Sequence, residues 1–313
     1  MKRSDEFART HLFRRLAWDD LDTDFLRKQI ELARNEDLGG AGLKASLLPA
    51  IPRDVTTIGV PLQKMATAEL VAREPLHICG LPLVLLVLEI YGGDVEVDFA
   101  VADGEKVSAG TPLASLRGLS ATLLQAERVL LNFLQHLSGI SSKTAQYVAA
   151  LGNSPTRLLD TRKTTPGWRA LEKYAVAQGG GWNHRLGLFD RVMLKDNHLA
   201  ADQSTASERL ENAVRRARET EPELIIEVEV DHLEQIPPVI EAGADVVMFD
   251  NFSIEDLRQG VEMIGDRAYT EASGNVTLET LPELADLGLD FISCGAITHQ
   301  SRWKDIALDW KTT

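Results

Sequence analysis

Hydrophobic and polar positions in the first part of the chain predict one helix followed by extended segments. The stretch 21–38 spaces its apolar residues among charges as a helix does, and it ends at two glycines, a common helix stop. After a loop that holds two prolines, segments 66–73 and 95–102 are predicted to be extended. The apolar run 81–90 fits either a buried helix or a strand. We therefore expect a small α/β sandwich at this end of the chain.

A longer helix is predicted over 123–148. Its apolar residues recur at helical spacing, for example at Leu130, Leu134 and Leu137. Gly139 interrupts this pattern, so the helix is either broken there or packed tightly against a neighbour. A helix of this length would connect two domains.

Beyond this helix, short apolar runs alternate with helical stretches. Glycines and polar capping residues mark the ends of the helices, whereas Pro237-Pro238 requires that one helix is short or begins late. Apolar strands separated by helices argue for a parallel sheet covered on its faces. The predicted strands cover 156–159, 191–194, 224–230, 244–249, 268–270 and 289–293.

The predicted fold is therefore of the α/β class, with an N-terminal α/β sandwich and an incomplete α/β barrel of about six strand-helix units. A chain of 313 residues agrees with two domains. We place the sandwich at 1–128 and the barrel at 129–298. The C-terminal tail, 299–313, is expected to pack on the sandwich.

Polar and charged side chains gather where the predicted strands end. In closed β/α folds, the C-terminal ends of the strands form the rim on which active sites assemble, so six separate segments can face one pocket. The residues at or just past these ends are Asp160, Arg162, Lys163, Lys195, Asp196, Asn197, Glu229, Asp250, Asn251, Ser273, Gly274 and Gly295.

The charge of one segment contrasts with that of the whole chain. The formal net charge of −14 opposes binding to the phosphates of nucleic acids. Segment 157–198 nevertheless contains eight Lys and Arg against four Asp and Glu. A solvated helix face would interleave cations with carboxylates at spacings of three and four, whereas several of these cations lie beside turn-forming residues. The segment therefore predicts an anion-binding site.

Composition narrows the class of protein. Hydrophobic residues make up 44% and charged residues 26%, as in soluble globular proteins. Cys79 and Cys294 are too few for a disulfide framework or a CxxC metal site. The first residues lack the apolar core of a signal peptide, and no run reaches the ~18 apolar residues that a membrane span needs. We expect a cytoplasmic protein that binds neither membrane nor nucleic acid.

Four cations of segment 157–198 differ in what they can bind. Arg162 and Arg185 can each hold a carboxylate or phosphate through two parallel hydrogen bonds, and Lys163 and Lys195 add point charges. Any one of them could be a surface salt-bridge partner. As a cluster, they favour a ligand with several anionic groups.

Carboxylates and small residues complete the candidate site. Glu229 and Asp250 end successive strands, which suits a Mg²⁺ ion held by one or two carboxylates and by substrate oxygens. Each alone could equally be a helix cap or a salt bridge inside the barrel. Ser273, Gly274 and Gly295 offer backbone N–H groups without bulk, as a terminal phosphate requires.

The roles of two features are left open, and several kinds of chemistry are disfavoured. His184 could be a core histidine or a hydrogen-bond donor to substrate, and the preceding Gly179-Gly180-Gly181 could be a flexible loop. The chain has no GxxxxGK[ST] loop, no GxGxxG after a strand and no nucleophile elbow, which disfavours ATP hydrolysis, dinucleotide redox chemistry and acyl transfer. The histidines without ligand spacing, expected to be structural, are His11, His77, His136, His232 and His299.

A series of motifs resembles the quinolinate phosphoribosyltransferases. DTRKTTPG, LEKYAV, GGGWNHR, KDNH, EVEV, FDN, EASGN and CGAITH occur in that family's order, and AERVLLNFLQHLSGI and REPLHICGLP extend the resemblance to the first domain. The resemblance implies a sandwich and an incomplete barrel, and a homodimer with a shared active site or a higher assembly of dimers. It implies transfer of phosphoribose from phosphoribosyl pyrophosphate to quinolinate with decarboxylation in NAD biosynthesis, with Mg²⁺ and without an organic cofactor.

The resemblance also assigns roles to individual residues. The pyridine dicarboxylate would be surrounded by Arg162, Arg185, His184 and Lys195, with Arg128 reaching in from a second subunit. The pyrophosphate, ribose and Mg²⁺ would face Lys163, Glu229 and Asp250, and the 5-phosphate would lie at Ser273, Gly274 and Gly295. Catalytic roles would fall to Lys163, Lys195, Glu229 and Asp250.

The chain departs from the family pattern in three places. The loop 40–53 is longer than expected, Trp168 and Trp182 replace aliphatic residues, and the tail ends differently. Three alternatives stay open: a related phosphoribosyltransferase that acts on another heterocycle, a Schiff-base lyase that uses Lys195 or Lys163, and a sugar-phosphate sensor without catalysis.

Overall fold

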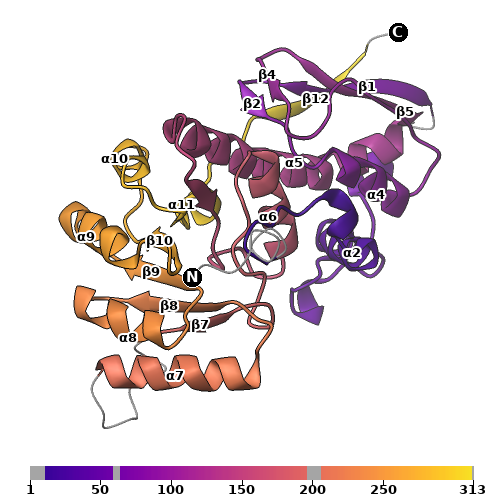
Figure 1. The fold of residues 1–313 in the computed structure, drawn as a ribbon. Helices are drawn as coiled ribbons and strands as arrows, with labels where there is room; N and C mark the ends of the chain where they lie inside the picture. The colour runs from indigo at the N-terminus through magenta and orange to yellow at the C-terminus, as the bar shows by residue number, and fades with distance from the viewer. Residues whose placement is uncertain (1–10, 59–63, 196–205, 312–313) are drawn as a thin grey trace. The chain divides into compact units, whose positions relative to one another are not determined.

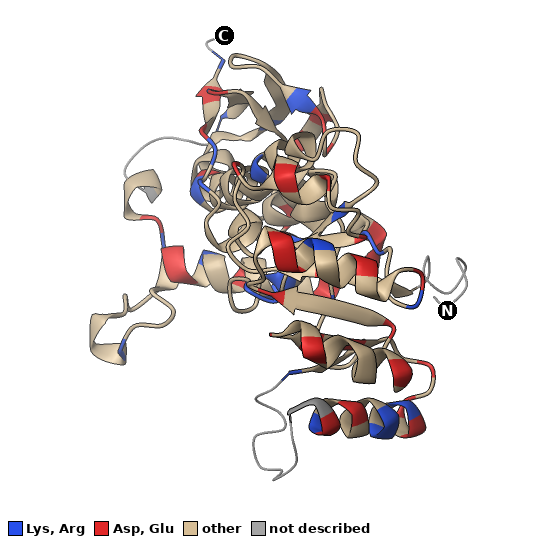
Figure 2. Ribbon diagram, turned by 60° about the vertical axis from the view of Figure 1, so that its left-hand side comes forward, with Lys and Arg blue, Asp and Glu red and all other residues tan. Residues whose placement is uncertain are grey.

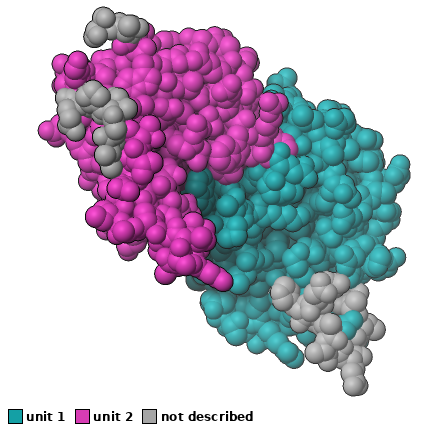
Figure 3. All heavy atoms as spheres, turned by 180° about the vertical axis from the view of Figure 1, so that it is seen from behind, with its two compact units in different colours: residues 1–16, 144–300 teal, residues 17–143, 301–313 magenta. Residues whose placement is uncertain are grey.

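The computed structural model describes residues 11–58, 64–195 and 206–311. The chain forms two compact units (Figure 3). Unit 1 contains 144–300 together with the described residues up to Leu16, and unit 2 contains 17–143 and the tail from Ser301. The division falls at 143/144, whereas the sequence placed it at 128/129, and both positions lie inside helix α5 (Ser120–Ala150).

An antiparallel sheet of four strands, in the order β12-β1-β5-β3, forms the centre of unit 2. Leu70 of β1 pairs with Leu308 of β12 on one side and with Ala114 of β5 on the other. The tail strand β12 therefore completes the sheet of this unit. The elements of unit 2 before α5 are η1 (Trp18–Asp20), α2 (Thr23–Gly39), η2 (Ala45–Leu47), α3 (Val55–Ile58), β1 (Met65–Ala72), β2 (Leu76–His77), α4 (Leu81–Tyr91), β3 (Glu96–Phe99), β4 (Lys106–Val107) and β5 (Pro112–Leu119), and β12 spans Ile306–Trp310.

The apolar run that fitted either a helix or a strand forms helix α4. Pro82 lies in its first turn, where a missing N–H costs no helical hydrogen bond. The Asp103 carboxylate accepts hydrogen bonds from the backbone N–H groups of Gly80 and Leu81, at 2.8 and 2.9 Å. These contacts satisfy donors that the start of a helix leaves without partners.

Helix α5 is continuous, and Gly139 is a site of close packing instead of a break. A Cβ atom added at Gly139 would overlap the backbone carbonyl of Arg302. Nearby, Gln135 donates a hydrogen bond of 2.8 Å to the carbonyl oxygen of Ile306. Although α5 has 31 residues, no helix in the described ranges is apolar enough over a sufficient length to cross a membrane.

Unit 1 is built on a parallel sheet of six strands in the order β6-β11-β10-β9-β8-β7. The strands that begin and end the order, β6 and β7, are not paired with each other, so the barrel is incomplete, as predicted. The strands are β6 (Arg157–Leu159), β7 (Val192–Leu194), β8 (Ile226–Val230), β9 (Val246–Asp250), β10 (Tyr269–Ser273) and β11 (Phe291–Ser293).

Helices follow the strands of unit 1, and α7 to α10 lie along the outside of the sheet (Figure 1). Pro237 and Pro238 lie in the first turn of α8, which begins late and is short, as the sequence required. Helix α10 begins at Leu281, after a turn that follows β10. The helices are α6 (Arg169–Gln178), α7 (Ala206–Thr220), η4 (Leu233–Gln235), α8 (Ile236–Glu241), α9 (Ile254–Ile264), α10 (Leu281–Ala285) and α11 (Ala296–His299).

The N-terminal segment packs into the core of the barrel. Leu12 is 1% exposed among residues near the starts of the strands, such as Val246 and Phe291. The ring of Phe13 lies 6.1 Å from that of Trp182, and the Arg15 guanidinium lies 4.0 Å from the Trp182 ring centre. Trp182 therefore provides an aromatic surface for this segment, a role that explains one departure from the family pattern.

Candidate active site

A cavity of about 660 Å³ lies at the C-terminal ends of the barrel strands. All of its lining residues belong to unit 1. The sequence had placed nine of them in the site: Arg162, Lys163, His184, Arg185, Lys195, Glu229, Asp250, Ser273 and Gly274. The lining also includes Asn251, which the sequence had placed at the rim of the barrel without a role. Its other residues are Thr161, Met193, Met248, Asn275 and Ser293.

The remaining candidates differ in their positions. Gly295 precedes α11, and a Cβ atom there would come within 2.9 Å of the Lys163 side chain, so the glycine leaves room for that lysine. Arg128 lies on α5 in unit 2, and its side chain is exposed. Asp196 and Asn197 lie outside the described residues.

Positive charge is concentrated in this cavity, although acidic positions are spread over both units (Figure 2). Burial lowers the pKa of Arg185, and the neighbouring Arg162 guanidinium lowers it further. Two guanidinium groups that repel each other gain from an anion placed between them. This side of the cavity is suited to a ligand with more than one carboxylate.

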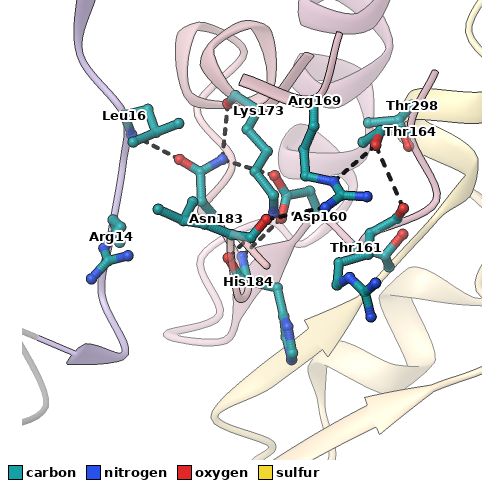
Figure 4. Close-up of polar contacts among 12 residues, drawn as sticks. Arg14, Leu16, Asp160, Thr161, Thr164, Arg169, Lys173, Asn183, His184 and Thr298 are labelled. Carbon is teal, nitrogen blue, oxygen red and sulfur yellow. Dashed lines mark hydrogen bonds and ion pairs between the residues drawn. The ribbon is translucent and has the colours of Figure 1, made fainter. Parts of the chain in front are cut away.

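Asp160 holds together the two segments that carry these cations (Figure 4). Its carboxylate accepts hydrogen bonds from Nζ of Lys173 at 2.6 Å, from the backbone N–H of His184 at 2.8 Å and from Nδ2 of Asn183 at 2.8 Å. All these groups are buried. Because Asp160 follows β6 directly, its contacts tie the end of this strand to the segment of His184 and Arg185.

The loop after β6 is fixed by further hydrogen bonds. Thr298 of α11 donates to the backbone carbonyl of Lys163 at 2.8 Å, and Nε of Arg169 donates to Oγ1 of Thr164 at 3.1 Å (Figure 4). Such contacts limit the conformations of the loop before any ligand arrives, which reduces the entropic cost of binding.

The glycine-rich segment before His184 is packed against its neighbours and is therefore not the flexible loop that the sequence left open. Gly181 is buried, and a Cβ atom there would lie 2.8 Å from side-chain atoms of Thr144 and Val176. Arg15 donates hydrogen bonds of 2.6 and 2.9 Å to the carbonyl oxygens of Gly180 and Gly181.

Glu229 is the penultimate residue of β8 and Asp250 is the last residue of the adjacent strand β9, and both line the cavity. Lys195 forms an ion pair with Glu229, which agrees with the simpler interpretation of Glu229 as a barrel salt bridge. Burial raises the pKa of Glu229 against the effect of Lys195. Two carboxylates on one cavity wall are donors that fit Mg²⁺, an ion that keeps waters and substrate oxygens as its other ligands.

The turn after β10 has an unusual backbone. Gly274 and Asn275 both have positive φ angles, 97° and 50°, and Asn251 on the neighbouring loop has φ of 56°. The Asn275 amide donates to Oδ1 of Asn251 at 3.1 Å. A side chain at Gly274 would clash with Asn251, so only glycine fits there.

A buried polar layer below the rim was missed by sequence reasoning. Glu227 precedes Glu229 by two residues, and Glu271 precedes Ser273 by two, so each lies on the cavity side of its strand, one layer deeper. Both are completely buried. The alternation in EVEV was a usable signal, because two carboxylates on one face of a buried strand require partners. The partners of Glu227 are His184 and Arg191.

Comparison with known proteins places this site in a family. Residues 54–138 match the N-terminal domain of quinolinate phosphoribosyl transferase, and residues 140–309 match its C-terminal domain. The nicotinate-nucleotide pyrophosphorylase [carboxylating] of Mycobacterium leprae is 40% identical over 296 residues, which cover 93% of this chain and 99% of that protein. A probable enzyme of the same name from Bacillus subtilis is 39% identical over 82% of this chain and 87% of its own length.

Solved structures give the same result for the fold. The nicotinate-nucleotide pyrophosphorylase of Francisella tularensis superposes with a TM-score of 0.85 at 32% identity, covering 95% of this chain and all of the other. The sandwich and incomplete barrel predicted from the sequence are therefore confirmed. The matches to both domains and to full-length relatives show that this chain belongs to the quinolinate phosphoribosyltransferase family.

Proposed function

We propose that this protein transfers phosphoribose from phosphoribosyl pyrophosphate to quinolinate, with loss of carbon dioxide, and so forms nicotinate mononucleotide for NAD biosynthesis. The observation that carries the proposal is one cavity with paired guanidinium groups and paired carboxylates. The names of the full-length relatives support it. The polyanionic substrates require a cationic pocket in a protein whose net charge is −14.

The pyridine dicarboxylate is assigned to the side of the cavity that carries Arg162 and Arg185. Each guanidinium can hold one carboxylate through two hydrogen bonds, which fixes the plane of the ring. His184 and Lys195 border the same space. Met193 and Met248 add apolar surface, which suits the faces of an aromatic ring.

Phosphoribosyl pyrophosphate is assigned to the part of the cavity that is lined by Lys163, Glu229, Asp250 and the turn after β10. Lys163 would neutralise the departing pyrophosphate, and the turn at Ser273 and Gly274 would hold the 5-phosphate. Glu229 and Asp250 would hold Mg²⁺, directly or through water. When bound, this ion neutralises oxygens of the leaving pyrophosphate.

The reaction then follows from charge. As the bond between C1 and pyrophosphate breaks, positive charge develops on the ribose and negative charge on the leaving group, where fixed cations are most effective. The pyridine nitrogen attacks C1 and becomes a pyridinium. When carbon dioxide leaves C2, its bonding electrons stay on the ring, which this positive charge stabilises, until a proton is added. No organic cofactor is needed for these steps.

The structure argues against the alternative of a Schiff-base lyase. A Schiff-base lysine must be a neutral amine when it attacks a carbonyl. Nζ of Lys195 is instead engaged in an ion pair with the Glu229 carboxylate. Borohydride in the presence of substrate would trap a Schiff base, and we expect no covalent adduct.

Assembly and location remain predictions. A homodimer in which Arg128 enters the cavity of the second subunit agrees with its exposure on α5. Sedimentation of the purified protein tests the dimer. A cytoplasmic location is tested by fractionation of cells that express the chain.

The function is tested by a single assay. Purified protein is incubated with quinolinate, phosphoribosyl pyrophosphate and Mg²⁺, and pyrophosphate and labelled carbon dioxide are measured. We expect equal amounts of both products, and none when quinolinate is replaced by nicotinate, which lacks the second carboxylate. Product formation from another heterocycle alone would favour the related transferase instead.

A further inference from the structure

A buried cluster of His184, Arg191, Glu227 and Glu271 lies below the rim of the barrel; we call it the His184 cluster. All four residues are at most 5% exposed. Nε2 of His184 lies 3.1 Å from the Glu227 carboxylate and 3.4 Å from Oε1 of Glu271. Nη1 of Arg191 lies 2.9 Å from Oε2 of Glu227 and 3.2 Å from the same ring nitrogen.

Glu271 is the unusual member of this cluster. Neither of its carboxylate oxygens has a hydrogen-bond partner among the described residues, although the side chain is completely buried. A buried ionised carboxylate requires a compensating charge. Arg191 is bonded to Glu227, and the ion-pair partner of Glu271 is the ring of His184. Within the cluster, two carboxylates therefore face one guanidinium and one imidazole, and the Arg185 guanidinium also acts on Glu227.

We propose that Glu227 and Glu271 are positioning residues that keep both ring nitrogens of His184 protonated, so that Nδ1–H donates a hydrogen bond to a carboxylate of the substrate. His184 lines the cavity, and its Nε2 is directed to the two glutamates. Its Nδ1 has no hydrogen-bond partner in the described part of the chain. The inference rests on the proposed function and specifies how one substrate carboxylate is recognised.

The positions of the ring protons decide whether His184 attracts or repels that carboxylate, and Nε2, which faces two carboxylates, is the nitrogen that has to carry a proton. A neutral ring with its proton on Nε2 would present a lone pair at Nδ1. Burial opposes the charged ring, but Glu227 and Glu271 outweigh both burial and Arg191 and raise the pKa of His184 to about 9. Two further groups fix its backbone: the Asp160 carboxylate accepts its N–H, and Lys173 donates to its carbonyl oxygen.

The same atoms could hold a cation, because one ligand atom from each of His184, Glu227 and Glu271 lies within 4.8 Å of the others. Arg191 already places a positive charge beside Glu227 and the ring. The positive charge of Arg191 would repel a metal ion at this position, so a proton on the ring is favoured over a metal.

The first experiment measures the ring directly. Histidine labelled with ¹⁵N in the ring is incorporated into the full chain, and His184 is assigned as the signal lost in His184→Gln. We expect both nitrogens to be protonated at pH 7.5, with deprotonation near pH 9. Glu271→Gln should lower this pKa by at least about one unit, since one attractive charge is removed, whereas Glu271→Asp should restore most of the shift. Glu262→Gln, at an exposed glutamate of α9, serves as the control.

The second experiment measures kinetics on variants that retain the thermal unfolding temperature of the wild type. If the pKa of His184 falls from about 9 to about 8, the protonated fraction at pH 8 falls from about nine tenths to about one half, so Glu271→Gln should raise KM for quinolinate about twofold at this pH. The rise should approach about tenfold at a pH above both pKa values. KM for phosphoribosyl pyrophosphate should stay unchanged. The pH above which quinolinate binding weakens should move downward in the same variant.

The outcomes separate the two proposals. A wild-type protein that does not turn over quinolinate overturns the proposed function. If the enzyme is active but the His184 ring is neutral at pH 7.5, the inference about His184 is overturned and the proposed function is not. This holds whether the second ring proton is absent or has moved to Glu271. An equal rise of both KM values, or displacement of the ring proton by micromolar Zn²⁺, also overturns it.

Discussion

At the residue scale, Arg162 and Arg185 differ from the other cations of the cavity because each offers a rigid pair of N–H donors. We expect Arg162→Ala and Arg185→Ala each to weaken quinolinate binding by roughly 2–5 kcal/mol, because the partner carboxylate would be desolvated without its hydrogen bonds. Calorimetric titration with quinolinate measures this loss. Arg215→Ala is the matched control, since Arg215 forms an exposed pair with Glu211 on α7. Affinities like that of the wild type in both variants would contradict the assignment.

Glu229 and Asp250 are expected to act on the other substrate. Glu229→Ala and Asp250→Ala should raise KM for phosphoribosyl pyrophosphate and increase the Mg²⁺ concentration needed for half-maximal rate, because oxygen ligands of the ion are removed. Quinolinate binding in the absence of the second substrate should change little for Asp250→Ala. Asp286→Ala, at an exposed residue after α10, controls for charge. Unchanged Mg²⁺ titrations would remove both residues from the site.

At the element scale, helix α5 provides a test of packing. Alanine is normally favoured over glycine inside a helix by about 1 kcal/mol. At Gly139 we expect the opposite: Gly139→Ala should lower the free energy of unfolding by about 1–3 kcal/mol, because its methyl group meets the Arg302 carbonyl. Urea denaturation measures the change. Gln146→Ala, at an exposed position of the same helix, should cause little loss. If Gly139→Ala stabilised the protein, Gly139 would not lie close to the Arg302 carbonyl.

At the scale of the whole molecule, the cavity and Arg128 belong to different compact units. The shared-site hypothesis predicts that two inactive variants, Arg128→Ala and Lys195→Ala, regain activity when mixed. A mixed dimer would have one cavity with an intact Lys195 from one chain and an intact Arg128 from the other. Activity is measured after subunit exchange has been verified by mass spectrometry, and each variant incubated alone is the control. Exchange without recovery would exclude the shared site.

The sequence by itself determined the strands and the rim of the barrel. Apolar periodicity is local, so the helix at 23–39 and all six barrel strands could be recognised from neighbouring residues. Because parallel strands end at one edge, polar residues at their ends had to converge, and nine predicted residues line one cavity. The motifs also identified the family.

Tertiary structure alone decided the layer below the rim and the limits of the units. His184 meets Glu227 and Glu271 across 43 and 87 positions of sequence, and no local pattern carries such a contact. The fit of Gly139 against Arg302 and the packing of Trp182 on the N-terminal segment likewise join distant parts of the chain. Local periodicity fixes which face of an element is buried, whereas the partner that covers it is chosen by the packing of the whole core.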